Sequence, residues 1–443
     1  GSNNTALGSK ALQQNTTANN NTAVGYQAGY SNSTGDRIVA VGEGSLYSNT
    51  TGGYNVALGS KPLRSNTTGA SNVAIGHEAL YSNTTASNNT AVGFEASYAS
   101  STGASNTAVG WRALTSNTGS NNTAVGNQSL YDSTTGVRNS AYGDNSLANN
   151  TTANNNNAFG YLSLYTNTTG TANVAMGTES LFSNTTASNN TAVGYQAGYS
   201  NTTGIVNVAI GNEAMYSNSI GNGVVAVGHA TLRGNTASNN TAVGMTALNA
   251  NTSGTRNVAV GGGAYGFTNG ALGSNTTGSF NTAVGDQSLL NNTTASNNTA
   301  LGGGALLFNT TASNNTALGE AALYLNTTGE QNTALGRRAL YSQTSGLYNT
   351  AVGLHAGYYS TGSWNTFIGH DAGAASGFTG SKNTILGRYN GNQDGLNIRT
   401  RSSHVVLSDG DGDRRFHAAE KGTNIYARKD NRAGGWSFGA NIV

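Results

Sequence analysis

A five-residue block, Asn-(Thr/Val)-Ala-(Val/Ile/Leu)-Gly, recurs with small variations 23 times along the 443-residue chain, mostly at steps of 17 residues. A fixed period of this kind is typical of repeat architectures, in which each repeat packs mainly on its neighbours. The step from Gly261 to Gly285 is 24 residues long, which predicts an insertion near residues 262–273. Structural glycines of the block include Gly25, Gly76, Gly194, Gly211 and Gly302.

Numbered from its Asn, the repeat predicts one solenoid turn. Positions 1–5 are expected to form a short strand, and positions 8–10, often Ala-Leu-Tyr, a second extended segment. Asn-Thr-Thr-Gly near positions 12–15 has the chemistry of a turn. No 3.6-residue periodicity indicates a helix. The fold class predicted is therefore all-β, a parallel β-solenoid or β-roll of about 23 turns.

Alternation along the strand predicts which side chains are buried. We expect positions 2 and 4, Thr or Val and an aliphatic residue, to point into the core, and positions 3 and 5, Ala and Gly, to point outward. The small outer face would then suit close packing between chains. Pro62 occupies position 8, and because proline cannot donate a hydrogen bond, the amide at this position is predicted not to be an obligatory donor to the next turn.

Composition excludes several classes of protein. The chain has 63 Gly, one Pro and no Cys, which excludes disulfide scaffolds, thiolate zinc sites and cysteine nucleophiles. No apolar run reaches the length of a transmembrane helix. A net charge of +2 gives no reason to expect nucleic acid as a partner. The sequence contains no recognisable catalytic constellation, so we expect neither enzyme activity nor a cofactor.

Charge divides the chain into two regions. Residues 382–443 contain ten Lys or Arg and six Asp or Glu, a net of +4, whereas the preceding residues have a net of −2. We therefore predict a repetitive shaft over residues 1–387 and a small β-rich cap or tip, built of hairpins, over residues 388–443.

Few residues suggest a metal site. Asp409, Asp411 and Asp413 alternate with Gly and are weak candidates for calcium, but Arg414 stands where a calcium loop needs Gly. The favoured interpretation is a hairpin turn, and no metal is predicted. The six histidines are far apart in sequence, and exposed or turn positions are the expected ones for His77, His229, His355, His370, His404 and His417.

Tyrosine recurs at position 10 of the repeat. A stacked aromatic ladder that stabilises neighbouring turns is the favoured interpretation. The alternative is a stripe that contacts glycans, for which the candidates are Tyr30, Tyr81, Tyr199, Tyr216 and Tyr341. Regular Thr rows also raise an ice-binding alternative, which the exchange of Thr and Val at position 2 disfavours.

These motifs resemble a known family of repeats. The blocks 72–76 and 207–211 resemble the repeat of trimeric autotransporter adhesin heads, and the longer segment 190–204 resembles repeats of phage-type tail fibres. The resemblance covers about residues 1–387, although the adhesin turn is shorter, and it implies a left-handed β-roll that trimerises. Segment 405–416 resembles the hairpin before the intramolecular chaperone of endosialidase-type fibres. That chaperone is not present here, and we expect a processed fibre.

The expected function is structural and adhesive. The chain is predicted to form the homotrimeric shaft of a phage-like tail fibre that presents a receptor-binding tip to a cell-surface glycan or other receptor. The alternative is a bacterial cell-surface adhesin or extracellular filament subunit, and a third, less favoured, is an ice- or glycan-binding solenoid. Each of these is extracellular, on a virion tail or a cell surface, without membrane insertion.

Overall fold

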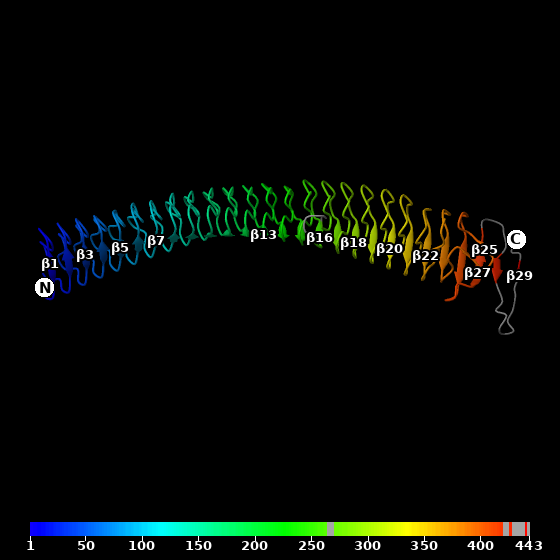
Figure 1. Cartoon of the computed structure of the whole chain (residues 1–443), viewed down its shortest axis with the longest axis horizontal. Helices are drawn as coiled ribbons and strands as arrows, with labels where there is room; N and C mark the ends of the chain where they lie inside the picture. The colour runs from blue at the N-terminus through cyan, green and yellow to red at the C-terminus, as the bar shows by residue number, and fades with distance from the viewer. Residues whose placement is uncertain (264–269, 420–424, 428–438, 441–443) are drawn as a thin grey trace. The chain divides into compact units, whose positions relative to one another are not determined.

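A computed structural model describes residues 1–263, 270–419, 425–427 and 439–440. The described chain is all-β, and no helix occurs in these ranges. It divides into two compact units, Gly1–Gly223 and Val224–Val443. Both are built from the same parallel solenoid turn, and 23 turns with a three-residue strand each account for most of the chain, as predicted (Figure 1).

The first unit contains strands β1 to β13, and each of β1 to β12 is parallel to and in register with the strand that follows it. In the pair β2–β3, Thr22 lies opposite Val39 and Ala23 opposite Ala40. The strands are β1 Thr5–Leu7, β2 Thr22–Val24, β3 Val39–Val41, β4 Val56–Leu58, β5 Val73–Ile75, β6 Thr90–Val92, β7 Thr107–Val109, β8 Thr123–Val125, β9 Ser140–Tyr142, β10 Asn157–Phe159, β11 Val174–Met176, β12 Thr191–Val193 and β13 Val208–Ile210.

The second unit continues the same pattern through β14 to β23. The insertion after Gly261 leaves the register intact, because Val258 still lies opposite Thr282. Residues 264–269 of the predicted insertion lie outside the described ranges. The strands are β14 Val225–Val227, β15 Thr241–Val243, β16 Val258–Val260, β17 Thr282–Val284, β18 Thr299–Leu301, β19 Thr316–Leu318, β20 Thr333–Leu335, β21 Thr350–Val352, β22 Thr366–Ile368 and β23 Thr384–Leu386.

Pairing changes after β23. Strand β26 (Val405–Ser408) is parallel to β23, but β27 (Arg414–Ala418) is antiparallel to β26. Tyr389, which follows β23, is fully buried and donates its hydroxyl hydrogen to the carbonyl of Leu396, 2.7 Å away. The remaining strands are β24 Asn392–Gln393, β25 Leu396–Asn397, β28 Ile425–Ala427 and β29 Gly439–Ala440.

The prediction of a second extended segment at positions 8–10 is wrong. In the described turns these positions form tight bends, and position 9 is left-handed: Leu63 has φ 50° and Leu80 φ 51°. A left-handed conformation costs a bulky residue about 1–2 kcal/mol. Both leucines are completely buried, which contributes roughly 1.5–3 kcal/mol per side chain and offsets that cost. The bend is therefore stabilised by the side chain that it turns inward.

The predicted direction of the strand faces is also wrong. Position 3 is the buried one: Ala74 has no exposed surface, whereas Ile75 at position 4 is 37% exposed. The pattern recurs in almost every strand, with the middle residue buried and its neighbours facing outward. The interior takes its large apolar side chain from the bend, at position 9, so only alanine fits opposite it. From β2 onward, the Ala residues of the predicted small outer face are therefore buried in the core of the described turns.

Buried asparagines form two ladders, each interrupted at a few turns. At position 12, Asn66 donates from its side-chain amide to Oδ1 of Asn49 in the preceding turn, at 2.7 Å, and to the carbonyl of Gly69 in its own turn, at 2.9 Å. At position 1, the backbone amide of Asn72 donates to Oδ1 of Asn55, at 2.9 Å. A buried amide that makes these bonds avoids an uncompensated desolvation cost. The recurrent Asn residues therefore link neighbouring turns.

Backbone geometry explains the recurrent Gly and the tolerated Pro. Gly194 has φ 130°, and a Cβ there would lie 2.6 Å from the carbonyl oxygen of Gly211 in the next turn. The position-8 amide donates within its own turn, as from Ser45 to the Gly42 carbonyl at 3.4 Å. Pro62 therefore breaks no bond between turns, and its carbonyl still accepts from Leu46 at 3.1 Å. The prediction from Pro62 is confirmed.

Candidate functional site

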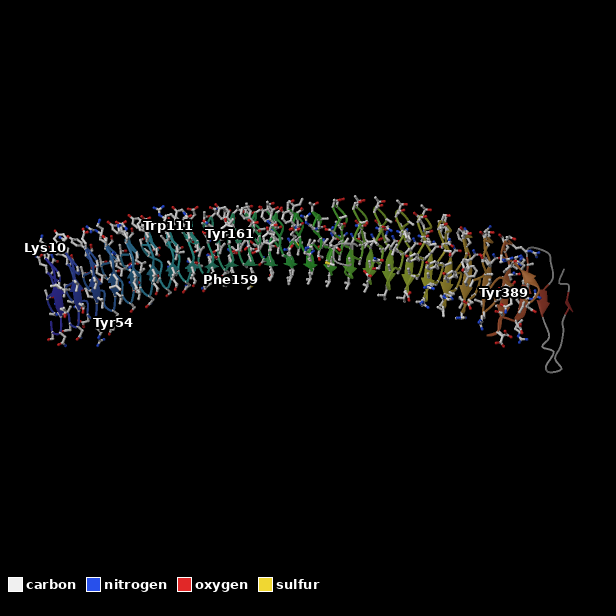
Figure 2. The ribbon with its side chains drawn as sticks, viewed as in Figure 1. Lys10, Tyr54, Trp111, Phe159, Tyr161 and Tyr389 are labelled. Carbon is white, nitrogen blue, oxygen red and sulfur yellow. The ribbon has the colours of Figure 1, made fainter. Side chains whose placement is uncertain are left out.

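An outward apolar row runs along the sheet of each unit at position 4 of the turn. Its residues are stacked in register, and Tyr142 and Phe159 lie face to face with ring centroids 4.7 Å apart. Figure 2 shows Phe159 at the lower edge of the ribbon. We call these residues the position-4 row; its members with more than a third of their surface exposed are Leu7, Ile75, Tyr142, Phe159, Met176, Ile210, Val243, Val260, Leu301, Leu318, Leu335, Ile368 and Leu386.

Other exposed aromatic residues stand at position 6, on the bend. His77 stacks on Phe94 with ring centroids 5.1 Å apart, and Trp111 is 43% exposed with the Arg112 guanidinium 4.7 Å from its ring. Trp111 lies at the upper edge of the ribbon in Figure 2, opposite Phe159. The bends and the strands therefore present two different outer surfaces.

The tyrosines of position 10 form stacked ladders. Tyr324, Tyr341 and Tyr358 stack in succession with centroids 5.0 and 4.9 Å apart. Of the predicted glycan contacts, Tyr30, Tyr81, Tyr199, Tyr216 and Tyr341 each stack on a neighbouring ring. Burial raises the pKa of the Tyr199 and Tyr358 hydroxyls, and neighbouring tyrosines add to the effect, so both remain proton donors. A ring inside a ladder presents its edge and hydroxyl, whereas an end ring presents a face.

Two ladder ends differ in the residue that the next turn places over the last ring. Tyr47 is succeeded at the same position by Arg64, whose guanidinium carbon lies 5.1 Å from the Tyr47 ring centroid. Tyr358 is succeeded by Ala374, which is too small to cover a ring. Tyr359 stands beside Tyr358 in an edge-on arrangement, with centroids 4.5 Å apart and planes inclined by 69°. The second ladder end therefore has a missing ring.

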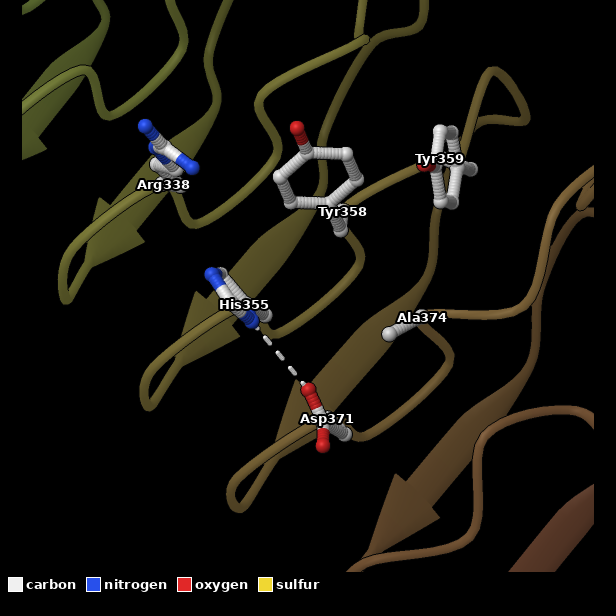
Figure 3. Close-up of a pocket in the computed structure, with 6 residues that line it drawn as sticks. All are labelled: Arg338, His355, Tyr358, Tyr359, Asp371 and Ala374. Atoms are coloured by element: carbon white, nitrogen blue, oxygen red, sulfur yellow. Dashed lines mark ion pairs between the residues drawn. The ribbon is translucent and has the colours of Figure 1, made fainter.

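A pocket of about 290 Å³ lies at this ladder end. Figure 3 shows its lining: the two tyrosine rings and Ala374 form one side, and charged side chains of the bend form the other. The lining residues are Arg338, His355, Tyr358, Tyr359, Asp371 and Ala374. All of them belong to the second unit and come from three consecutive turns.

Asp371 is the acidic centre of the pocket. Its two carboxylate oxygens lie 3.3 Å from Nδ1 of His355 and 3.1 Å from Nδ1 of His370. Within the described ranges, neither Nε2 of His355 nor Nε of Arg338 has a hydrogen-bond partner, although both atoms are buried. The pocket thus offers an aromatic face, a carboxylate acceptor and two nitrogen groups able to bind a polar ligand.

Asp409, Asp411 and Asp413, the weak candidates for calcium, form a turn. Oδ1 of Asp409 accepts from the backbone amides of Asp411 and Asp413, at 3.1 and 2.9 Å, and its other oxygen accepts from Arg415. This is the turn between β26 and β27, as the favoured interpretation predicts. No group of three or more metal-ligating side chains occurs among the described residues.

The expectation that all histidines are exposed or in turns is wrong for two of them. His404 and His417 are 6% and 5% exposed, and their rings stack with Nδ1 of His404 2.8 Å from Nε2 of His417. Burial lowers the pKa of His417 to about 4, and the neighbouring His404, Arg414 and Arg401 contribute to the same shift. The pair joins β26 to β27.

Comparison with known proteins adds no family. A search against models of protein families finds no match, and a search of curated proteins finds no significant similarity. Nowhere in the described ranges is there a helix of the length and apolarity needed to span a membrane.

The pocket is absent from the predictions made from the sequence. His355, Tyr359 and Asp371 are each ordinary residues for a turn, and the repeat period does not distinguish them from their equivalents in other turns. One signal was present: the tyrosine of position 10 recurs at Tyr324, Tyr341 and Tyr358 and then gives way to Ala374.

Proposed function

We propose that the chain forms the shaft of a self-associating adhesive fibre. The observation that carries this proposal is the position-4 row, an outward strip of Val, Ile, Leu and aromatic side chains in each unit. Soluble monomers rarely expose long contiguous apolar surfaces, and those that exist mark interaction sites. A second copy of the chain carries the same row, so the spacing between its exposed apolar side chains matches the spacing in the first copy.

The number of copies and the type of fibre rest on the resemblance of the repeats. It implies three chains around a common axis and the shaft of a phage-like tail fibre, extracellular and carried on a virion. The interface of this proposal is the position-4 row, because the Ala residues first expected to form it are buried. The other outer surface, along the bends, is then left for a receptor.

The C-terminal region is proposed to close the shaft and present its tip. Three large residues replace the core Ala in the last turns: Phe367, Ile385 and Val406 are all fully buried. The antiparallel strand β27 covers the edge of β26, and a covered edge cannot template further strand pairing. Both features support an end of the repeat rather than its continuation.

A bacterial cell-surface adhesin is the second candidate. The same self-associating shaft serves it, and the exposed aromatic residues of the bends, such as Trp111 and Tyr161, suit adhesion in either setting. A sequenced locus that encodes phage structural genes would favour the first candidate, and one that encodes an outer-membrane anchor the second.

The mass of the native assembly tests self-association. We expect light scattering coupled to size exclusion to give three times the chain mass. The double substitution of Leu318→Glu and Leu335→Glu places two charges in the position-4 row and leaves the buried core residues unchanged. It is expected to give monomers. Leu354→Glu, on an equally exposed leucine outside the row, is the matched control and is expected to assemble. A monomeric wild type would refute the proposal.

A further inference from the structure

We propose that the ladder end at Tyr358 is a carbohydrate site that accepts one pyranose ring in the place of the missing aromatic ring. The inference rests on the adhesive function proposed above and assigns it a location and a ligand class. It starts from the interrupted ladder, which ends in the pocket of Figure 3.

The spacing of the ladder leaves the place of one ring next to Tyr358. Tyr324, Tyr341 and Tyr358 stack at intervals of 5.0 and 4.9 Å, so the next place in the ladder is one ring thickness beyond Tyr358. Ala374 holds that place with a single methyl group. A pocket of about 290 Å³ is near the lower end for small-molecule sites, which suits one sugar unit rather than a longer buried segment.

The chemistry of the walls fits a sugar. The C–H face of a pyranose is apolar and packs on an aromatic ring, while its hydroxyls point outward from the ring edge and require donors and acceptors. Tyr358 supplies the ring, and Tyr359 closes the space from the side with its edge-on ring. Asp371 accepts from hydroxyls, because each carboxylate oxygen has more than one lone pair.

The nitrogen groups complete the polar wall. His355 holds Asp371 through Nδ1, at 3.3 Å, and its Nε2 is buried with no hydrogen-bond partner in the described part of the chain. The same is true of Nε of Arg338. Buried polar atoms are normally paired, so these two indicate a ligand or water that supplies the bond.

The ladder end at Tyr47 gives an internal comparison. Arg64 lies over Tyr47, where its cation interacts with the ring face and leaves no room for a ligand. Tyr47 also lacks a His and Asp pair comparable to His355 and Asp371, because the equivalent positions hold Gly44 and Lys61. The chain therefore covers the ladder end at Tyr47 with its own arginine and leaves the ladder end at Tyr358 open beside a polar wall.

The test uses the full chain and saturation-transfer NMR with three probes: methyl glucoside, methyl galactoside and methyl N-acetylglucosaminide. We expect transfer to the ring C–H protons of at least one of them. Ala374→Tyr fills the space with the missing ring and is expected to weaken binding by about tenfold or more. Asp371→Asn is expected to weaken it too, and Arg64→Ala, at the covered ladder end, to leave it unchanged.

Two results would overturn the site. One is the absence of transfer to all three sugars in a chain with native circular dichroism, and the other is transfer that Ala374→Tyr leaves undiminished. Because Ala374→Tyr continues an existing ladder, it is expected to fold, and its circular dichroism checks this. Failure of the site leaves the measured mass of the assembly untouched, so the two proposals fail separately.

Discussion

His404 and His417 stack face to face with Nδ1 of one ring 2.8 Å from Nε2 of the other, in a buried position between β26 and β27. A hydrogen bond of this kind requires at least one neutral ring, since two imidazolium groups would present only donors to each other. The C-terminal strands are therefore joined by a contact that depends on pH.

The first prediction concerns the His417 pKa, which burial lowers from 6.5 to about 4. The unfolded chain binds more protons than the folded one between these values, so the pair's contribution to stability is complete above pH 6.5 and is lost as pH falls towards 4. The protection factors of the β27 amides, which are hydrogen-exchange rates corrected for the intrinsic rate at each pH, are expected to fall as pH is lowered over this range.

A variant separates this effect from general acid sensitivity. His417→Phe keeps a stacked ring that cannot titrate, so the protection factors of its β27 amides are expected to lose most of their pH dependence between 6.5 and 4. His77→Phe, which replaces a histidine of the first unit, serves as the control and is expected to leave the protection of the β27 amides unchanged. An unaltered pH profile in His417→Phe would show that another group is responsible.

Gly194→Ala is expected to be strongly destabilising. Its φ of 130° is unfavourable for any L-residue with a side chain, and the new Cβ would meet the Gly211 carbonyl oxygen at 2.6 Å. Backbone strain of this type costs roughly 1–3 kcal/mol, and the steric conflict adds to it. Chemical denaturation followed by circular dichroism measures the loss. Gly303→Ala is the control, because its φ is outside the left-handed range and a Cβ there would meet only the Asp286 carbonyl oxygen, at 3.9 Å, and a comparable loss there would contradict the argument.

The period of the sequence was sufficient to predict the solenoid but not the direction of its side chains. Alternation in a three-residue strand is compatible with either face being buried, and hydrophobicity alone favours burial of Val73 and Ile75 over Ala74. The deciding residue is Leu80, which enters the core from a left-handed bend and leaves room only for alanine. Left-handed leucines are rare enough that no propensity predicts them.

The pocket could not be predicted for a related reason. Its residues combine three turns, and Asp371 meets His355 and His370 only because neighbouring turns stack in register. Once the solenoid is known, the ladder positions can be read directly from the sequence. The gap at Ala374 then becomes visible as a missing ring.

Gln343→Asn is predicted to stabilise the second unit. Gln343 interrupts the position-12 ladder, and within the described residues both its Oε1 and Oδ1 of Asn326 are buried without a hydrogen-bond partner. Asparagine would donate to Asn326 as Asn326 itself donates to Asn309, at 3.0 Å. A restored buried bond contributes about 1 kcal/mol. Thermal unfolding measures the gain, and Gln13→Asn, at an exposed site, is expected to give none; a loss of stability in Gln343→Asn would contradict the ladder account.

The last prediction concerns Phe367, which replaces the core Ala of position 3 and is fully buried. Its ring is accommodated because the usual Leu of position 9 is replaced by Gly: a Cβ at Gly373 would lie 2.4 Å from the Phe367 ring. Phe367→Ala leaves a cavity and is expected to cost about 3–5 kcal/mol. Adding Gly373→Leu restores the Ala and Leu pair of the ordinary turn, with Leu in the left-handed conformation that Leu340 already adopts.

The double variant is therefore expected to recover much of the lost stability, whereas Gly373→Leu alone is expected to destabilise through its clash with the ring. A double-mutant cycle in chemical denaturation measures the coupling between the two positions. If the losses of the two single variants simply add in the double variant, the side chains at positions 3 and 9 do not share one space in the core. The leucine of the bend would then not be the reason for the alanine at position 3.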